Sequence, residues 1–272
     1  MTDVTADSRF CIETETLHIP SLTKTYRLFQ MSDSHMSPDS PLDTAEDREK
    51  AARQREIWMA HGNGLTQEEN VLSLTAYART LAADRLLFAG DMTDFPSVGT
   101  ADAAKTMFDA AGPYLYAPGN HEQAHRFPAF FAPAMNGDPA LQVQELGELR
   151  LVAVDNAAHS VEDRVIEALE TILHGDKPVI LLHHTPLDHP TLRPDAEAYW
   201  QDVTYFLFGG TGDGKNVRRY VQLLTEEHTQ LKAIVAGHLH LKHVDTFPNG
   251  VTQFVSAPAL AGYARVIEVK GP

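Results

Sequence analysis

Apolar residues occur along this chain in two patterns, short continuous runs and helical spacing, which together predict alternating strands and helices. Short runs rich in Val, Ile and Leu, bounded by turn-forming residues, predict buried strands. The strands predicted in this way cover residues 26–31, 86–89, 114–117, 149–155, 179–182, 233–236, 251–256 and 265–269. A further strand over 10–19 is expected to pair antiparallel with 26–31 around a turn near residues 20–24.

Apolar positions spaced three and four residues apart predict helices between these strands. Thr44 with Asp47, and Thr66 with Glu69, resemble capping boxes that open two helices. The other predicted helices lie around residues 103–111, 165–173, where Ser160 is a candidate cap, and 217–224. We therefore predict a sheet-centred α/β sandwich in one domain over 1–272, with 1–9 as a flexible tail.

Composition and charge narrow the possible functions. The single cysteine, Cys11, excludes an intramolecular disulfide and a thiolate zinc site. With 22 Lys and Arg against 37 Asp and Glu, the net charge is −15, which argues against a long nucleic acid as partner. No apolar stretch approaches a membrane span, and the N-terminus lacks the features of a signal peptide, so a cytoplasmic protein without membrane contact is expected.

Polar residues with metal-binding side chains follow five of the predicted strands. The five motifs are Asp33-Ser34-His35, Gly90-Asp91, Gly119-Asn120-His121-Glu122, His183-His184-Thr185-Pro186 and Gly237-His238-Leu239-His240. In an extended strand, residues i and i+2 point to one side, so the Asp-x-His and His-x-His pairs each offer two ligands. Oxygen and imidazole donors at strand ends predict a site for two divalent metals such as Mn, Fe or Zn.

In this order and position, the five motifs resemble those of the calcineurin-like metallophosphoesterase superfamily, in particular its small bacterial-type phosphodiesterase-like members. The resemblance implies a four-layer α-β-β-α sandwich with mixed sheets and a binuclear metal centre. It also implies a metal-dependent phosphoric ester hydrolase that uses a metal-activated hydroxide for in-line attack on phosphorus. Carried over by position, the metal ligands are Asp33, His35, Asp91, Asn120, His183, His238 and His240, with Asp91 bridging.

Two of these assignments need a further argument. His183 and His184 leave a strand toward opposite faces, and we choose His183 because it directly follows the apolar run, leaving His184 as the alternative. His121 resembles the family's non-ligand histidine that protonates the leaving group, and Glu122 or a distant acid is expected to raise its pKa. Asp94 is expected to tether its own loop.

Residues that recognise the rest of the substrate are less marked. His125 and Arg126 lie close to the Asn120 motif and are candidate substrate contacts. Residues 209–216 fit the P-loop pattern but place Asn216 where that motif needs Ser or Thr, so we expect a glycine loop whose Lys215 contacts a substrate phosphate. Loop aromatics such as Phe127 and Trp200 could cover a substrate or pack on one another.

The sequence therefore favours a small-molecule phosphodiesterase. A phosphomonoesterase or pyrophosphatase on the same site remains an alternative, as does a catalytically silent metal-binding interaction scaffold. The natural substrate, the native metals and the oligomeric state are left open.

Overall fold

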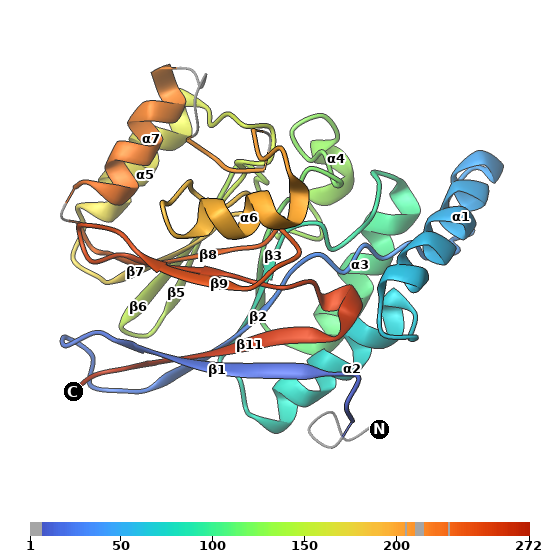
Figure 1. Cartoon of the computed structure of the whole chain (residues 1–272), viewed down its shortest axis with the longest axis horizontal. Coiled ribbons are helices and arrows are strands. Elements are labelled where there is room, and N and C mark those ends of the chain that lie inside the picture. The colour runs from blue at the N-terminus through green and yellow to red at the C-terminus, as the bar shows by residue number, and fades with distance from the viewer. Residues whose placement is uncertain (1–6, 205, 210–214, 228) are drawn as a thin grey trace.

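The strands of the chain form two mixed sheets that pack face to face (Figure 1). The structure is a computed structural model and describes residues 7–204, 206–209, 215–227 and 229–272. The first sheet has five strands in the order β1-β11-β2-β3-β4. Its strands are β1 (Cys11–His18), β2 (Tyr26–Met31), β3 (Arg85–Ala89), β4 (Tyr114–Ala117) and β11 (Tyr263–Lys270).

The second sheet has six strands in the order β5-β6-β7-β8-β10-β9. They are β5 (Leu141–Leu146), β6 (Leu149–Val154), β7 (Val179–Leu182), β8 (Leu231–Ala236), β9 (His243–Thr246) and β10 (Thr252–Val255). In each sheet a parallel core carries antiparallel strands toward its edges: β2-β3-β4 are parallel in the first, and β6-β7-β8-β10 in the second. The carboxyl ends of these parallel strands can therefore converge on one edge of the sandwich.

Apolar side chains from both sheets fill the space between them. Leu28 of β2 and Leu87 of β3 belong to this inner layer, as do Leu151 of β6, Ile180 of β7 and Val235 of β8, and all five are buried. Alternate residues of the same strands point outward, where helices cover them. Because both faces of the central strands are buried, their sequences are apolar at nearly every position.

Helices complete four layers, α-β-β-α. Helices α2 (Gln67–Thr80) and α3 (Val98–Ala111) cover the outer face of the first sheet, and α5 (Asp163–Leu173) and α7 (Lys215–Thr225) cover the second (Figure 1). The remaining helices are α1 (Ala45–His61), α4 (Pro128–Phe131), α6 (Leu192–Trp200) and the short 3-10 helix η1 (Ala259–Ala261). The predicted sandwich architecture is confirmed. No helix within the described ranges is long and apolar enough to span a bilayer.

The predicted helix starts are confirmed where a side chain supplies a cap. The Thr44 hydroxyl accepts from the backbone of Asp47 at the start of α1, and Thr66 and Glu69 form a full capping box at α2. Ser160 does not cap α5, which begins after Glu162 without a side-chain cap. A missing cap is tolerated because Val165 and Leu169 anchor the helix in the core.

The expected pairing of the first two strands is wrong. β11 lies between them, parallel to β1 and antiparallel to β2. Ile267 and Val269 of β11 enter the layer between the sheets, whereas Ala264 and Val266 pack under the helices, so β11 is buried on both faces. Placing β11 between β1 and β2 buries both of its apolar faces, which is more favourable than leaving it at the edge of the sheet beside a β1–β2 hairpin. The short turn between β1 and β2 does not prevent this insertion.

Candidate metal centre

The motif residues lie at the carboxyl ends of β2, β3, β4, β7 and β8, where the two sheets meet. Several of them have left-handed backbone torsions: φ is 54° at Asp33, 47° at His35 and 50° at Asp91, and 72° at His238 and 54° at His240. The backbone is therefore not extended through the motifs, which was the condition for residues i and i+2 to point to one side. Non-glycine residues adopt this conformation at a cost, which the surrounding structure must offset, and such residues gather at functional sites.

Asp33, His35 and His240 form the first group of ligand atoms. Their donor atoms all lie within 4.8 Å of one another. The Nε2 atoms of His35 and His240 are 3.2 Å apart, and His240 Nε2 lies 3.5 Å from Asp33 Oδ1. Burial works against the charge of Asp33, but the neighbouring His240 outweighs it and lowers the pKa of this carboxyl. An anionic carboxylate beside two imidazoles is a donor set that suits a transition metal.

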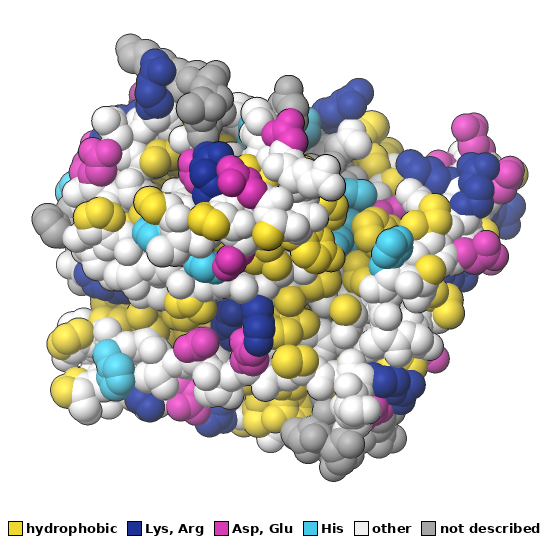
Figure 2. Space-filling model, viewed as in Figure 1, with side chains coloured by type: hydrophobic (Ala, Val, Ile, Leu, Met, Phe, Trp, Pro, Cys, Tyr) yellow, Lys and Arg dark blue, Asp and Glu magenta, His cyan; other side chains and the backbone are white. Residues whose placement is uncertain are grey.

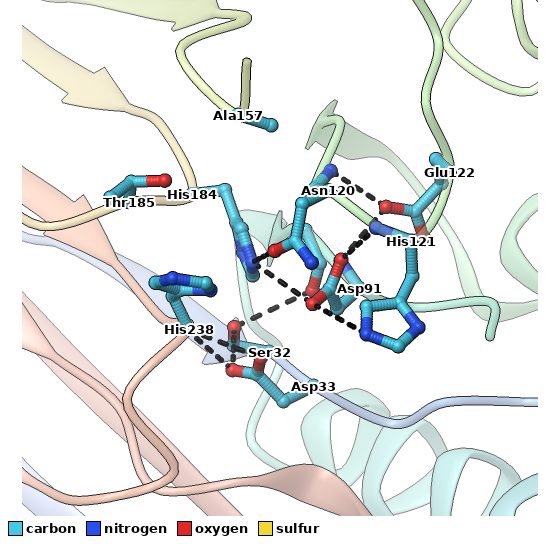
Figure 3. Close-up of polar contacts among 12 residues, drawn as sticks. Ser32, Asp33, Asp91, Asn120, His121, Glu122, Ala157, His184, Thr185 and His238 are labelled. Atoms are coloured by element: carbon cyan, nitrogen blue, oxygen red, sulfur yellow. Dashed lines mark hydrogen bonds and ion pairs between the residues drawn. The ribbon is translucent and has the colours of Figure 1, made fainter. Parts of the chain in front are cut away.

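Asp91, His184 and His238 form the second group. His184 Nε2 lies 3.1 Å from Asp91 Oδ2 and 3.2 Å from Asn120 Oδ1, and all of these side chains point toward one another (Figure 3). His184 Nδ1 donates to the carbonyl of Ala89 at 2.7 Å, so Nε2 is left to face the group. Asn156 accepts from the backbone N–H of His184 at 3.1 Å and so supports its loop.

The sequence predicted that His183 faces the ligand groups, but in the structure His184 faces them. His183 Nδ1 lies 3.1 Å from the Tyr220 hydroxyl on α7, on the outer side of the second sheet. The alternation of β7 explains this: Ile180 and Leu182 point between the sheets, so His184 follows them inward. His183 continues the outward register of Leu181, and burial lowers its pKa to about 3.

Asp91 links the two groups through a further cluster of donor atoms. It also belongs to a group with His35 and His121, so carboxylate and imidazole donors continue from one group to the other. Its pKa lies well below the usual range: burial would raise it, but the neighbouring His184 and His121 outweigh that effect. Gly119 makes the approach of β4 possible because a Cβ at this position would collide with the Asp91 carboxylate.

His121 lies beside the groups and is held by Asp94. Its Nδ1 is 2.8 Å from the Asp94 carbonyl and 3.1 Å from Asp94 Oδ1, whereas Nε2 faces Asp91 at 4.0 Å (Figure 3). Burial opposes protonation, but Asp91 and Asp94 outweigh it and raise the pKa of His121 to about 10. Asp94 does more than tether its loop, because its carboxylate also lies 3.1 Å from His35 Nδ1.

Glu122 has a structural position instead of the expected one beside His121. Its carboxylate is buried and accepts hydrogen bonds from the backbone N–H groups of Asp91, Thr93 and Gly119, at 2.9, 2.8 and 2.6 Å. The Tyr116 hydroxyl donates to it at 2.7 Å. Glu122 therefore joins the loops that follow β3 and β4.

The predicted substrate contacts are not among the ligand groups. His125 lines a cavity of about 280 Å³ together with Asp155 and Arg164, and none of the predicted metal ligands is among its lining residues. Arg126 is exposed and donates to Gln123. The side chain of Lys215 and residues 210–214 lie outside the described residues. The described residues before this loop form the end of α6 and turns, so they provide no strand of the kind a P-loop requires.

Two tryptophans border the ligand groups: Trp58, which the sequence did not single out, and Trp200, which stacks on Phe206 as one of its two expected roles allows. The Trp58 ring on α1 stacks on the His35 imidazole with 4.1 Å between centroids. Trp200, at the end of α6, lies 5.9 Å from the His240 ring and donates to the Leu239 carbonyl. In Figure 2, histidine side chains are visible between the surfaces formed by α6 and α1. Phe127 instead stacks on Phe130.

The donor set fits two metal ions. Each group combines a carboxylate with imidazoles, and the Nδ1 atoms of His35 and His184 are engaged by Asp94 and Ala89, which directs Nε2 of both rings inward. Such hydrogen bonds to the second ring nitrogen accompany metal ligation in proteins. The fold and the site thus define an α/β sandwich with a two-metal ligand set at the meeting edge of its sheets.

The calcineurin-like phosphoesterase family model matches residues 26–242, so the chain belongs to this family of binuclear metal-dependent enzymes. It is a metal-dependent phosphoester hydrolase. No curated protein sequence matches the chain significantly.

Solved structures share the fold at low sequence identity. A dimetal phosphatase from Danio rerio has a TM-score of 0.54 and 11% identity over 87% of this chain and 88% of its own. TT1561 of Thermus thermophilus has a TM-score of 0.51 and 11% identity, over 87% and 91%. The purple acid phosphatase PPD1 of yellow lupin has a TM-score of 0.54 and 14% identity, over 90% of this chain and 45% of its own.

Proposed function

We propose that the protein hydrolyses phosphodiesters of small molecules at a binuclear site. Asp33, His35 and His240 would hold one metal, Asn120, His184 and His238 would hold the other, and Asp91 lies where it could serve both. The observation that carries this proposal is the chain of ligand groups through Asp91, with His121 held beside it. When bound, two cations supply the positive charge that activates water and stabilises the developing negative charge on phosphate oxygens.

His121 is the residue proposed to protonate the leaving group. Asp94 fixes its Nδ1, so Nε2 faces the centre, where the phosphoester binds. The anionic neighbours Asp91 and Asp94 favour the protonated ring in the metal-free protein. A general acid must lie within hydrogen-bond reach of the departing oxygen and must already hold a proton. The direction of Nε2 meets the first requirement, and the raised pKa of His121 meets the second.

The contacts around the ligand groups favour a diester over a monoester. The described contacts to these groups come from carboxylates, imidazoles, an amide, two indoles, the Ser32 hydroxyl and the Phe206 ring, and none of these described contacts comes from Arg or Lys. A monoester carries a second negative charge, which calls for cationic side chains in addition to the metals. A diester carries one charge and needs fewer. A phosphomonoesterase or pyrophosphatase remains the second candidate because the related folds include phosphatases.

The metals proposed are Mn, Fe or Zn, since mixed nitrogen and oxygen donors suit them better than calcium. The substrate proposed is small. Acidic and basic side chains are interspersed on the face in Figure 2, and the net charge of −15 repels an extended phosphate backbone.

The test is hydrolysis of bis-p-nitrophenyl phosphate against p-nitrophenyl phosphate by metal-stripped protein reloaded with Mn²⁺. We expect metal-dependent turnover, faster with the diester, that disappears in Asp91→Ala. Asp109→Ala removes an exposed carboxylate on α3 and is the matched control. Preference for the monoester would assign the second candidate. No turnover on either compound, with two metals bound per chain, would favour the interaction scaffold.

A further inference from the structure

Trp58 contacts more of the centre than any other side chain on α1. Its indole stacks on His35 at an interplanar angle of 22°, and its centroid lies 5.8 Å from His240 and 6.4 Å from His121. These three imidazoles come from the loops after β2, β4 and β8. The Trp58 indole therefore lies next to imidazole rings from three different loops.

The indole N–H makes a second link. Trp58 Nε1 donates to Asp94 Oδ1 at 2.7 Å, the same oxygen that lies 3.1 Å from His35 Nδ1 and 3.1 Å from His121 Nδ1. Asp94 Oδ2 is buried and makes no hydrogen bond to any described residue. The orientation of this carboxylate therefore depends on the groups around Oδ1, and Trp58 is the one that approaches from α1.

The helix itself has little other reason to rest on the centre. Ala51 is the one buried residue of α1, and the exposed Ile57 and Met59 lie on either side of Trp58. The helix extends from the body of the protein beside α2 (Figure 1). A tryptophan that only packed a helix would be expected among aliphatic side chains, whereas the rings around Trp58 are histidines.

We propose that Trp58 is a positioning residue of the centre: it fixes His35 by stacking and Asp94 by a hydrogen bond, and through Asp94 it orients His121. The expected effect of Trp58 on turnover rests on the proposed function, whereas its expected effect on metal binding is independent of that function. The flat face of the indole limits rotation of the His35 ring, and the N–H holds the carboxylate that both histidines share.

The test is a double-mutant cycle between Trp58→Phe and Asp94→Ala. Phenylalanine keeps an aromatic face toward His35 but removes the N–H donor. We expect Trp58→Phe to weaken Mn²⁺ binding and to lower kcat by ~10-fold each, as the loss of a hydrogen bond to a charged group next to metal ligands does. In the Asp94→Ala background the same change should cost less than about 2-fold, because its partner is already gone.

Trp200→Phe is the matched control, since it removes an indole N–H that bonds to a main-chain carbonyl at the same centre. Its effect on Mn²⁺ binding should be the same with and without Asp94. Equal effects of Trp58→Phe in both backgrounds, or none in the native one, would overturn the proposal. If the wild-type protein turns over neither phosphoester, the proposed function fails, and the Mn²⁺ affinities still decide the role of Trp58.

A spectroscopic measurement covers variants that fold poorly. The chain has two tryptophans, so Trp200→Phe leaves Trp58 as the single indole emitter. In metal-free protein, adding Asp94→Ala should shift its emission maximum because the indole N–H loses its acceptor. An unchanged emission maximum would show that the hydrogen bond is not formed in solution and would overturn the proposal.

Discussion

His184 Nε2 lies 3.1 Å from Oδ2 of Asp91, and this contact joins the second sheet to the first at the ligand groups. His184 follows β7 of the six-stranded sheet, and Asp91 follows β3 of the five-stranded sheet. In the metal-free protein, burial opposes the charge on His184, but Asp91 outweighs it and raises the pKa of the ring to about 9. The two residues therefore attract each other before any cation is bound, which prearranges the site.

The adjacent histidines provide a matched pair of variants. We expect His184→Ala to lose one metal per chain and to reduce turnover by about 100-fold or more, because it removes a ligand that faces Asp91 and Asn120. His183→Ala should keep both metals but lose about 1–3 kcal/mol of stability, since it leaves the buried Tyr220 hydroxyl without its partner. Metal content and urea unfolding measure both. Loss of metal from His183→Ala alone would reverse the assignment.

His121→Ala should separate proton donation from metal binding. We expect both metals to remain and turnover of a diester with an alkoxide leaving group to fall by roughly 10²–10⁴-fold. A p-nitrophenolate leaving group needs no proton, so its hydrolysis should fall much less. His18→Ala, an exposed histidine on β1, serves as the control. An equal loss with both leaving groups would assign His121 to binding instead of proton transfer.

We expect the hydrogen bonds of Glu122 to stabilise the folded protein. Glu122→Gln places an amide N–H₂ against backbone N–H donors, and we expect it to lower the free energy of unfolding by about 1–3 kcal/mol and to weaken metal binding. Tyr116→Phe removes one donor to the same carboxylate and should cost less, about 1 kcal/mol. Urea unfolding in chelator measures the first effect. A Glu122→Gln variant as stable as wild type would show that the Glu122 carboxylate does not stabilise the loops after β3 and β4.

The strand ends were predictable because each carries its polar motif directly after an apolar run. The β7 register was not, because both faces of this strand are buried and its apolar run carries no alternation. Only the tertiary structure shows that Leu182 and His184 point between the sheets while His183 points to Tyr220. The same limit explains the β1–β11 pairing, which joins residues from opposite ends of the chain.

Supporting residues were harder to predict than ligands. Asp94 lies next to a recognisable motif, but its partners His35 and His121 are 59 and 27 positions away. Trp58 lies on a helix that reads as an exposed, charged segment, with no motif around it. Contacts of this kind follow from how the loops fold back over the sheet edge, and neither periodicity nor spacing encodes them.

Asp155 predicts a pH dependence of stability in metal-free protein. Burial raises its pKa from 3.8 to about 7 in the folded state. A raised carboxyl pKa means that the folded protein favours the protonated form. Stability is therefore unaffected by this group below pH ~4 and falls as the pH rises toward 7, by up to roughly 4 kcal/mol.

Asp155→Asn should accordingly be more stable than wild type at pH 8 by a few kcal/mol, and by clearly less at pH 5, because the amide carries no charge to bury. Urea unfolding in chelator at both pH values measures the difference. Ser160→Ala changes a non-titrating side chain of the same cavity and should give a difference that does not depend on pH. If the stability gain of Asp155→Asn were equal at pH 5 and pH 8, Asp155 would not be titrating between them, and the cavity would have to be more hydrated than its lining indicates.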